Sequence, residues 1–323
     1  MTPPLKTGIL GAGRIASGFG SQHDAMPHSL AHAINLTEGL ELGGFFDLDE
    51  ESADRAEKKW NIAPSPRKLR SWLDFDWDVI CIATPDDSHT THLAMTLEVK
   101  PKAILVEKPL STDFILSSRL LEDAPSLTTP FQVNFPRRWH PDLQKLATRI
   151  RQNEFGSLRR LHISCSGGIL HNGSHAIDLL ASWISPKILN SHQYHCQSAT
   201  HGQLSFSPAG DPIEIIFSEA VQEDCYLWEI TADFDLARVS IQDVPEILTI
   251  SIIKEHPDYT GFNALIAEQQ TNLELEPLLL YSVQNLVRLS RDEQLAQDQI
   301  TMEITHYKLL ASIFSAHLNH HHA

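Results

Sequence analysis

Residues 6–16 read KTGILGAGRIA, and this stretch decides the fold of the first third of the chain. Its apolar start predicts a buried strand, and its glycines predict a tight turn that leads into a helix. The alternation of strand and helix patterns continues downstream. Further strands are expected over residues 40–46, 77–83 and 103–106, with helices over 50–60 and 88–97. This order favours right-handed crossovers and a doubly wound parallel sheet.

The glycine pattern G-x-G-x-x-A in this stretch is typical of a dinucleotide-binding turn. Gly11 permits the tight turn, Gly13 lets the backbone approach a pyrophosphate, and the small Ala16 lets helix and strand pack closely. Arg14 and Ile15 lie at the start of the helix, where backbone N–H groups without helical partners can meet phosphates. Glycine-rich turns also simply connect strands to helices, so the pattern needs support from the next strand.

Asp47 follows the second expected strand and gives that support. Its carboxylate can accept hydrogen bonds from the adenosine ribose hydroxyls and would repel a 2′-phosphate, which favours NAD over NADP. Asp47 lies further from the glycines than the usual ~20 residues. We therefore interpret residues 18–29, GFGSQHDAMPHS, as an insertion before the rest of the first helix. The alternative is that Asp47 caps the helix expected over residues 50–60.

Composition restricts the class of protein. The 323 residues suit two domains, and 41 acidic against 25 basic side chains, without a basic run, argue against nucleic acid and anionic membranes as partners. The chain shows neither a signal-peptide pattern nor an apolar segment long enough to span a bilayer, so we expect a cytoplasmic protein. Its four cysteines are far apart and mostly lie in strand-like apolar runs. This indicates buried thiols rather than a disulfide framework or a zinc site.

The pattern changes in the second half of the chain, where residues 158–253 are mostly strand-like. We predict a dinucleotide-binding Rossmann domain over residues 1–125 and an α+β domain over 126–323, with the boundary near 124–130. The second domain is expected to hold a large, mostly antiparallel open sheet. Helices over residues 278–289 and 301–317 can cover only one of its faces. A homodimer or homotetramer through the other face is therefore expected.

Six segments resemble a known family: GAGRIA, FFDLD, CIATPDDSH, VEKPL, NFPRRWHP and LHNGSHAID, in this order. The chain is similar in these segments to the glucose–fructose oxidoreductase/inositol dehydrogenase (Gfo/Idh/MocA) family, and the resemblance fades after about residue 185. It implies an NAD-dependent oxidoreductase, a CH–OH dehydrogenase that transfers a hydride between nicotinamide and a hydroxyl carbon of a sugar, cyclitol or sugar derivative.

The segment VEKPL places Glu107 and Lys108 at the carboxyl end of a strand, where ligands bind in open parallel sheets. The resemblance implies that the Lys108 ammonium stabilises the alkoxide that develops on the substrate. Glu107 would orient this lysine and nearby cofactor atoms. The alternative is a surface turn with a local ion pair.

Five further residues acquire expected roles from the resemblance. Thr84, Pro85 and His89 would line the dinucleotide near its nicotinamide ribose, although alone they indicate a strand end and a helix start. Asn134 and Arg138, in QVNFPRRWHP, would bind substrate. For Arg138 an interdomain salt bridge is an equal alternative.

His175 falls where the family carries the histidine that takes the substrate proton, and imidazole suits proton exchange at neutral pH. A structural histidine, paired with Asp178 one helical turn later, is the alternative. Family members have an aspartate four residues before this histidine, but this chain has His171, which supplies no fixed negative charge. Either His171 and Asn172 bind sugar hydroxyls and the proton leaves by another route, or turnover is slow.

Histidines at residues 192–195 and 320–322 do not form closed ligand sets, so no metal is expected. Two other functions stay open. One is an NAD-retaining glycosidase or lyase that acts by transient oxidation, and the other is a non-catalytic NAD-binding sensor, which His171 favours. The sequence does not name the sugar, because the specificity segments lie where the resemblance fades.

Overall fold

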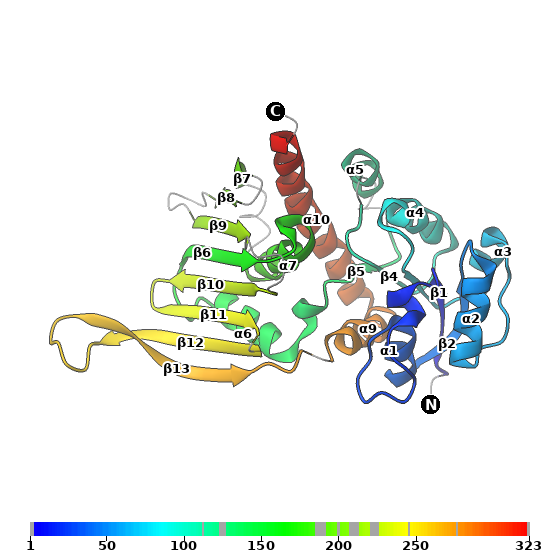
Figure 1. Cartoon of the computed structure of the whole chain (residues 1–323), viewed down its shortest axis with the longest axis horizontal. Coiled ribbons are helices and arrows are strands. Elements are labelled where there is room, and N and C mark those ends of the chain that lie inside the picture. Colours follow the sequence, from blue (N-terminus) through cyan, green and yellow to red (C-terminus); the bar gives the residue numbers. More distant parts are fainter. Residues whose placement is uncertain are drawn as a thin grey trace. The chain divides into compact units, whose positions relative to one another are not determined.

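The computed structural model describes residues 3–111, 113–122, 127–184, 192–198, 201–206, 213–219, 226–244, 246–275 and 277–321. The chain divides into two compact units (Figure 1). Unit 1 comprises Met1–Trp139 and Glu276–Tyr307, and unit 2 comprises His140–Leu275 and Lys308–Ala323.

Unit 1 is built on a five-stranded parallel sheet in the order β2-β1-β3-β4-β5. Its strands are β1 (Leu5–Leu10), β2 (Leu40–Phe46), β3 (Val79–Ile82), β4 (Ala103–Val106) and β5 (Phe131–Val133). The chain leaves β1 for β2 on one side and then returns to β3 on the other. The order thus reverses between β1 and β3, and ligands bind outside the carboxyl ends of strands at such a point. The predicted doubly wound parallel sheet is confirmed.

The helices of unit 1 follow the expected alternation. They are α1 (Leu30–Leu36), α2 (Glu50–Trp60), α3 (Leu69–Leu73), α4 (His89–Val99), α5 (Phe114–Glu122) and α9 (Leu278–Leu289), with α10 (Glu293–His321) beginning in this unit. α2 carries acidic residues in its first turn and Lys58 and Lys59 in its last, which complements the helix dipole. Its strong amphipathic pattern explains why its bounds could be predicted from sequence.

One face of the parallel sheet is covered partly by a helix from the far end of the chain. Ile9, Cys81 and Leu105 lie in the same buried cluster as Val283 and Leu286 of α9. α9 packs beside α1 and against β4. Unit 1 therefore extends beyond the boundary predicted at residue 125 and includes residues 276–307, because its core is not complete without them.

Unit 2 contains an eight-stranded sheet in the order β13-β12-β11-β10-β6-β9-β8-β7. Its strands are β6 (Leu158–Cys165), β7 (His192–Ser198), β8 (His201–Phe206), β9 (Ile213–Glu219), β10 (Trp228–Phe234), β11 (Ala237–Asp243), β12 (Glu246–Glu255) and β13 (Asn263–Asn272). All neighbouring pairs are antiparallel except β6 and β9. The predicted large, mostly antiparallel sheet is confirmed. Two helices of this unit, α6 (Pro141–Arg151) and α7 (Ser174–Trp183), pack together.

The two faces of this sheet differ in character. Along β10 and β11 every second side chain is buried, as at Ile230 and Ile241, and the residues between them are half-buried and polar. Arg160 and Arg238 both pair with Asp233 on this polar face. The predicted homodimer or homotetramer through this sheet stays a prediction.

Strands β12 and β13 form a long hairpin (Figure 1) whose second strand was not anticipated. Most of β13 is exposed on both sides, so it lacks the apolar alternation by which a strand is recognised. No helix of the described ranges carries an apolar stretch that could cross a bilayer. The boundary segment predicted at residues 124–130 lies partly outside the described residues.

Candidate functional site

The glycine turn after β1 has the backbone geometry that the motif requires. Gly11 has φ of +104°, and a Cβ there would approach the Ala83 carbonyl oxygen to 2.3 Å. The Gly11 N–H donates to the Phe46 carbonyl at 2.7 Å, which ties the turn to the end of β2. A Cβ on Gly13 would meet no atom within 4 Å. Gly11 is thus fixed by sterics, and the space at Gly13 is open to a ligand.

Residues after the turn form a short π-helical segment, Arg14–Gly18, and not the start of a long helix. Residues 19–29 then separate this segment from α1, in agreement with the predicted insertion. The Lys59 ammonium, from the end of α2, donates to the carbonyl oxygens of Ser17, Gly18 and Gly20. No sequence signal indicated this role, because a lysine late in an amphipathic helix is usually solvated.

Asp47 lies directly beside the glycine turn. Its Oδ2 accepts a hydrogen bond from the Ala12 N–H at 2.8 Å, and its Oδ1 accepts one from the Asp49 N–H at 2.9 Å. The residue at the N-cap of α2 is Asp49, so the capping alternative for Asp47 is not observed. A carboxylate accepts about four hydrogen bonds. Asp47 is half-buried and retains capacity for ribose hydroxyls, so the turn and this carboxylate fit a dinucleotide.

His89 connects the ends of two neighbouring strands. It is fully buried, with Nε2 2.7 Å from the Thr84 carbonyl oxygen and Nδ1 2.7 Å from the Pro109 carbonyl oxygen. Carbonyl oxygens only accept, so both contacts are hydrogen bonds only when both nitrogens carry protons. Both ring nitrogens thus lie at hydrogen-bonding distance from backbone carbonyl oxygens. The role expected for His89 beside a dinucleotide stays a prediction.

The hydroxyl group of Thr84 lies between two side chains of the following residues. Thr84 Oγ1 lies 3.0 Å from His92 Nδ1 and accepts a hydrogen bond from Ser88 Oγ at 3.0 Å. Pro85 caps the turn that precedes α4. Burial lowers the pKa of His92, and the charge of His89 adds to this lowering, so His92 is neutral at pH 7. The Thr84 side chain is thereby held at the carboxyl end of β3.

Glu107 and Lys108 follow β4, and both side chains are half-buried. Burial raises the pKa of Glu107, while the hydrogen bond from Asn134 and the charges of His89 and Lys108 oppose part of that rise. Burial lowers the pKa of Lys108, against the opposing effects of Glu107 and Asp86. An ammonium that is partly desolvated in this way interacts strongly with charge that develops nearby.

The two residues predicted to bind substrate after β5 have partners inside unit 1. Asn134 Nδ2 donates to Glu107 Oε1 at 2.7 Å. Arg138 and Glu303 form an ion pair with side chains 2% and 1% exposed, with N–O distances of 2.7 and 3.3 Å. The pair lies within one unit and is not the interdomain bridge considered from sequence. Glu303 is 165 positions away, so no local pattern indicated it.

The candidate acid–base residues belong to unit 2. His171 lies on a π-helical turn, Gly168–Gly173, and is exposed, with Nδ1 3.0 Å from Asn172 Oδ1. Asn172 Nδ2 donates to the Ser166 carbonyl at 2.7 Å. His175 is half-buried in the first turn of α7, and Asp178, one turn later, is buried. His171, Asn172 and His175 thus all lie around the junction of this turn and α7.

In the part of the chain that the structure describes, no group of three or more His, Cys, Asp or Glu side chains could hold a metal ion. The histidine side chains of residues 192–195 and 320–322 lie outside that part.

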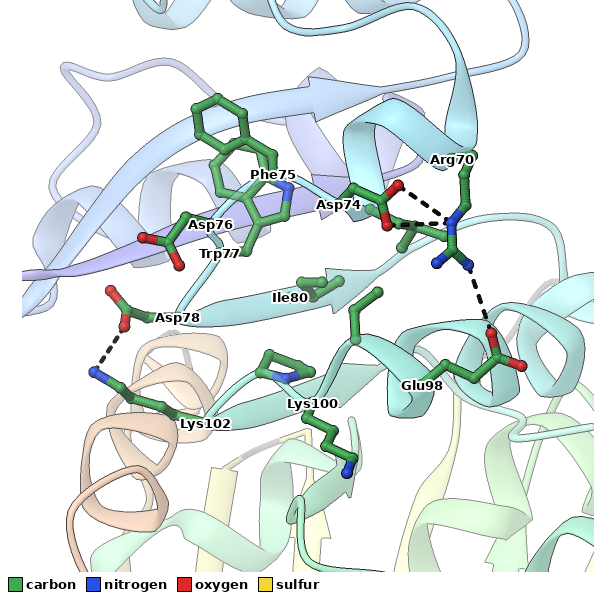
Figure 2. A pocket seen from close by; sticks show the side chains of 13 residues that line it. Arg70, Asp74, Phe75, Asp76, Trp77, Asp78, Ile80, Glu98, Lys100 and Lys102 are labelled. Atoms are coloured by element: carbon green, nitrogen blue, oxygen red, sulfur yellow. Dashed lines mark hydrogen bonds and ion pairs between the residues drawn. The ribbon is translucent and has the colours of Figure 1, made fainter.

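A separate polar pocket of about 510 Å³ lies at the amino ends of β3 and β4, opposite the strand ends that carry the motifs (Figure 2). Its charges are largely paired. Lys102 Nζ lies 2.7 Å from Asp78, and Arg70 contacts Asp74 at 3.1 Å and Glu98 at 3.6 Å. Exposed pairs of this kind contribute little to stability. The pocket shares no residue with the motif-bearing edge.

Comparison with known proteins identifies the first part of the chain. Residues 5–135 match the profile of the GFO_IDH_MocA family, described as an oxidoreductase family with an NAD-binding Rossmann fold. These residues form a Gfo/Idh/MocA domain. The match ends just after β5, so it covers all five strands of the parallel sheet.

Curated relatives of this Gfo/Idh/MocA domain include sugar and cyclitol dehydrogenases. An inositol 2-dehydrogenase of Corynebacterium glutamicum is 30% identical over 173 residues, which cover 52% of this chain and 48% of the relative. A glucose-6-phosphate 3-dehydrogenase of Bacillus subtilis is 25% identical over 158 residues, covering 49% of this chain and 41% of the relative. The matched part of the chain spans about half the length of these relatives.

Solved structures resemble both units together. A 3-ketoreductase from Actinomadura kijaniata, in complex with NADP and TDP-benzene, has a TM-score of 0.71 at 16% identity. The match covers 97% of this chain and 98% of the ketoreductase chain. An oxidoreductase from Agrobacterium radiobacter, in complex with NAD+, L-tartaric acid and magnesium, has a TM-score of 0.68 at 13% identity, with 98% and 96% covered. At these identities the similarity establishes the fold.

Proposed function

We propose that the protein is an NAD-dependent oxidoreductase that transfers a hydride between nicotinamide and a hydroxyl carbon of a sugar, cyclitol or sugar derivative. The observation that carries this proposal is Lys108, a partly desolvated ammonium at the carboxyl end of β4. It belongs to the same edge of the parallel sheet as the glycine turn and Asp47. The names of the inositol and glucose-6-phosphate dehydrogenases support the substrate class.

The cofactor would be held by the backbone at Gly11 and Gly13 and by the Asp47 carboxylate. A bound nicotinamide would supply the hydride acceptor or donor. The structural relatives bind NADP in one case and NAD+ in another, so their fold does not decide between the two. Asp47 favours NAD, because its negative charge beside the turn would repel a ribose 2′-phosphate.

The chain's own residues then have separate tasks. The Lys108 ammonium donates to the substrate hydroxyl oxygen and stabilises negative charge that develops there. His175 accepts the hydroxyl proton at a ring nitrogen. His171 and Asn172 bind other hydroxyls of the substrate, and the exposure of His171 leaves it accessible for this role.

Mass spectrometry of the small molecule retained on purification, followed by a panel of sugars and cyclitols assayed for NADH, tests this proposal. Net NADH formation that is lost in Lys108→Met supports it. Cleavage of an activated glycoside without net NADH would instead identify the NAD-retaining glycosidase or lyase. Bound NAD with neither activity would identify a sensor, which the histidine at position 171 favours.

A further inference from the structure

Buried polar side chains between β5 and α9 form a chain of hydrogen bonds that ends on Glu107. Asn285 Nδ2 donates to Gln132 Oε1 at 2.9 Å, and Gln132 Nε2 donates to Ser282 Oγ at 2.7 Å. Ser282 Oγ donates to Asn134 Oδ1 at 2.7 Å, and Asn134 Nδ2 donates to Glu107 Oε1 at 2.7 Å. The two asparagines, the glutamine and the serine are at most 4% exposed. A continuous buried path therefore joins α9 to the residue next to Lys108.

The orientation of the Asn134 amide sets the direction of the path. Its nitrogen faces Glu107 and its oxygen faces Ser282, so the Glu107 carboxyl group accepts from Asn134. The Ser282 hydroxyl must then donate to that oxygen, which leaves its lone pairs for the Gln132 amide nitrogen. Hydrogen bonds aligned in one direction polarise one another. All donors thus point toward the Glu107 carboxylate.

We propose that Asn134 is a positioning residue that keeps Glu107 anionic and oriented beside Lys108, and that α9 fixes Asn134 for this task through Ser282. The proposal rests on the proposed function, in which the Lys108 ammonium meets the substrate hydroxyl. It replaces the substrate contact expected for Asn134 from sequence, because both polar ends of its amide are engaged within the protein.

The surroundings of Glu107 make this donor necessary. The groups that act on its carboxylate are the Asn134 amide, the positive charges of His89 and Lys108, and the Lys108 backbone N–H. The neighbouring Cys81 thiol is fully buried, and burial raises its pKa, so it stays neutral. Burial favours the protonated form of Glu107, and loss of the amide donor would favour that form further.

The effect on Lys108 follows from its own neighbours. Glu107 and Asp86 favour its charged form, whereas burial and the positive charge of Arg137 oppose it. A protonated Glu107 would remove one of the two favourable charges. The ammonium would then be held less firmly where the substrate hydroxyl is expected.

Carbon-13 NMR of the glutamate side-chain carboxyls tests the inference without any need for turnover. The protein is labelled at the glutamate δ-carbon, and the Glu107 signal is assigned by its absence in Glu107→Gln. In Asn134→Leu, the Glu107 titration midpoint should rise by about one pH unit or more, the worth of a hydrogen bond to a charged group. Asn285→Leu is the matched control, because it removes a buried amide donor from the same path but leaves the donor to Glu107 in place. Its midpoint should stay near that of the wild type.

Ser282→Ala keeps the inference testable if Asn134→Leu does not fold. It removes the donor to Asn134 Oδ1 and should shift the Glu107 midpoint in the same direction by a smaller amount. An unchanged midpoint in both variants, or an equal rise in Asn285→Leu, would overturn the inference.

Enzyme assays separate this inference from the proposed function. In Asn134→Leu the acid limb of the kcat profile should move to higher pH while the alkaline limb stays, whereas a merely structural defect would lower kcat at every pH. Another outcome is that the Glu107 titration midpoint shifts as expected while neither the wild type nor any variant oxidises a sugar. In that case the positioning of Glu107 by Asn134 stands and the proposed function fails.

Discussion

Replacing Arg138 by methionine should destabilise the protein strongly, because it leaves the Glu303 carboxylate buried without this counter-charge. The two side chains are 2% and 1% exposed, so water cannot replace the guanidinium. Breaking a buried pair by removing one partner costs about 3–5 kcal/mol. Each kcal/mol lowers Tm by roughly 2–4 °C in a unit of roughly 150–250 residues, which gives a fall of roughly 6–20 °C.

Thermal unfolding followed by circular dichroism at pH 7 measures this change. The double variant Arg138→Met with Glu303→Leu should regain most of the loss, since well-packed apolar residues often substitute for a buried pair without cost. Arg70→Met is the control, because its ion pairs are exposed and should contribute about 0–1 kcal/mol. If Arg138→Met unfolds at the wild-type temperature but raises KM, the pair is not structural, and the substrate-binding role stands.

The remaining predictions concern the candidate site. Lys108→Met should lower kcat by about 10²-fold or more while NAD affinity measured by titration hardly changes. Because burial lowers the pKa of Lys108, wild-type activity should be present below that lowered value and be lost as pH rises through it, at a midpoint below the ordinary ~10.4 in a pH–rate profile. His175→Ala should reduce turnover, with partial rescue by added imidazole, and His171→Asp should raise activity or shift its pH optimum; wild-type rates in both would remove the acid–base assignment. NAD(H) should bind about tenfold or more tightly than NADP(H), and Asp47→Ala should narrow that gap; equal wild-type affinities in fluorescence titrations would contradict the role of Asp47.

Most of the parallel sheet could be predicted from sequence, because β3 and β4 are continuous apolar runs and β1 and β2 both end in apolar residues. Residues 40–46 and 103–106 were expected as strands and form β2 and β4 with these bounds. β13 was missed for the opposite reason. Its sequence NALIAEQQTN is mostly polar, and it is held in the sheet by backbone pairing with β12 and not by a buried face.

The site could be predicted only in part. Residues that directly follow a strand could be assigned to it, whereas their partners from distant parts of the chain could not. Parallel strands bring their carboxyl ends to one edge, so Asp47 and Lys108 could be assigned to that edge from their positions after strands. Their partners could not. Ser282 is 148 positions from Asn134, and no local pattern connects a serine inside an amphipathic helix to a carboxylate on another element. The role of such a residue depends on tertiary packing alone.

The late position of α9 in the chain has a consequence for biosynthesis. Gln132 and its partner Ser282 are 150 residues apart, so the ribosome completes β5 on the order of ten seconds before α9 exists. During that interval Leu105 and the rest of the β4 face lack the helix that covers them in the finished fold. Unit 1 therefore starts first but is completed only after most of unit 2 has been synthesised. Release of a chain that stops before α9 would leave an apolar sheet face exposed to other nascent chains and to chaperones.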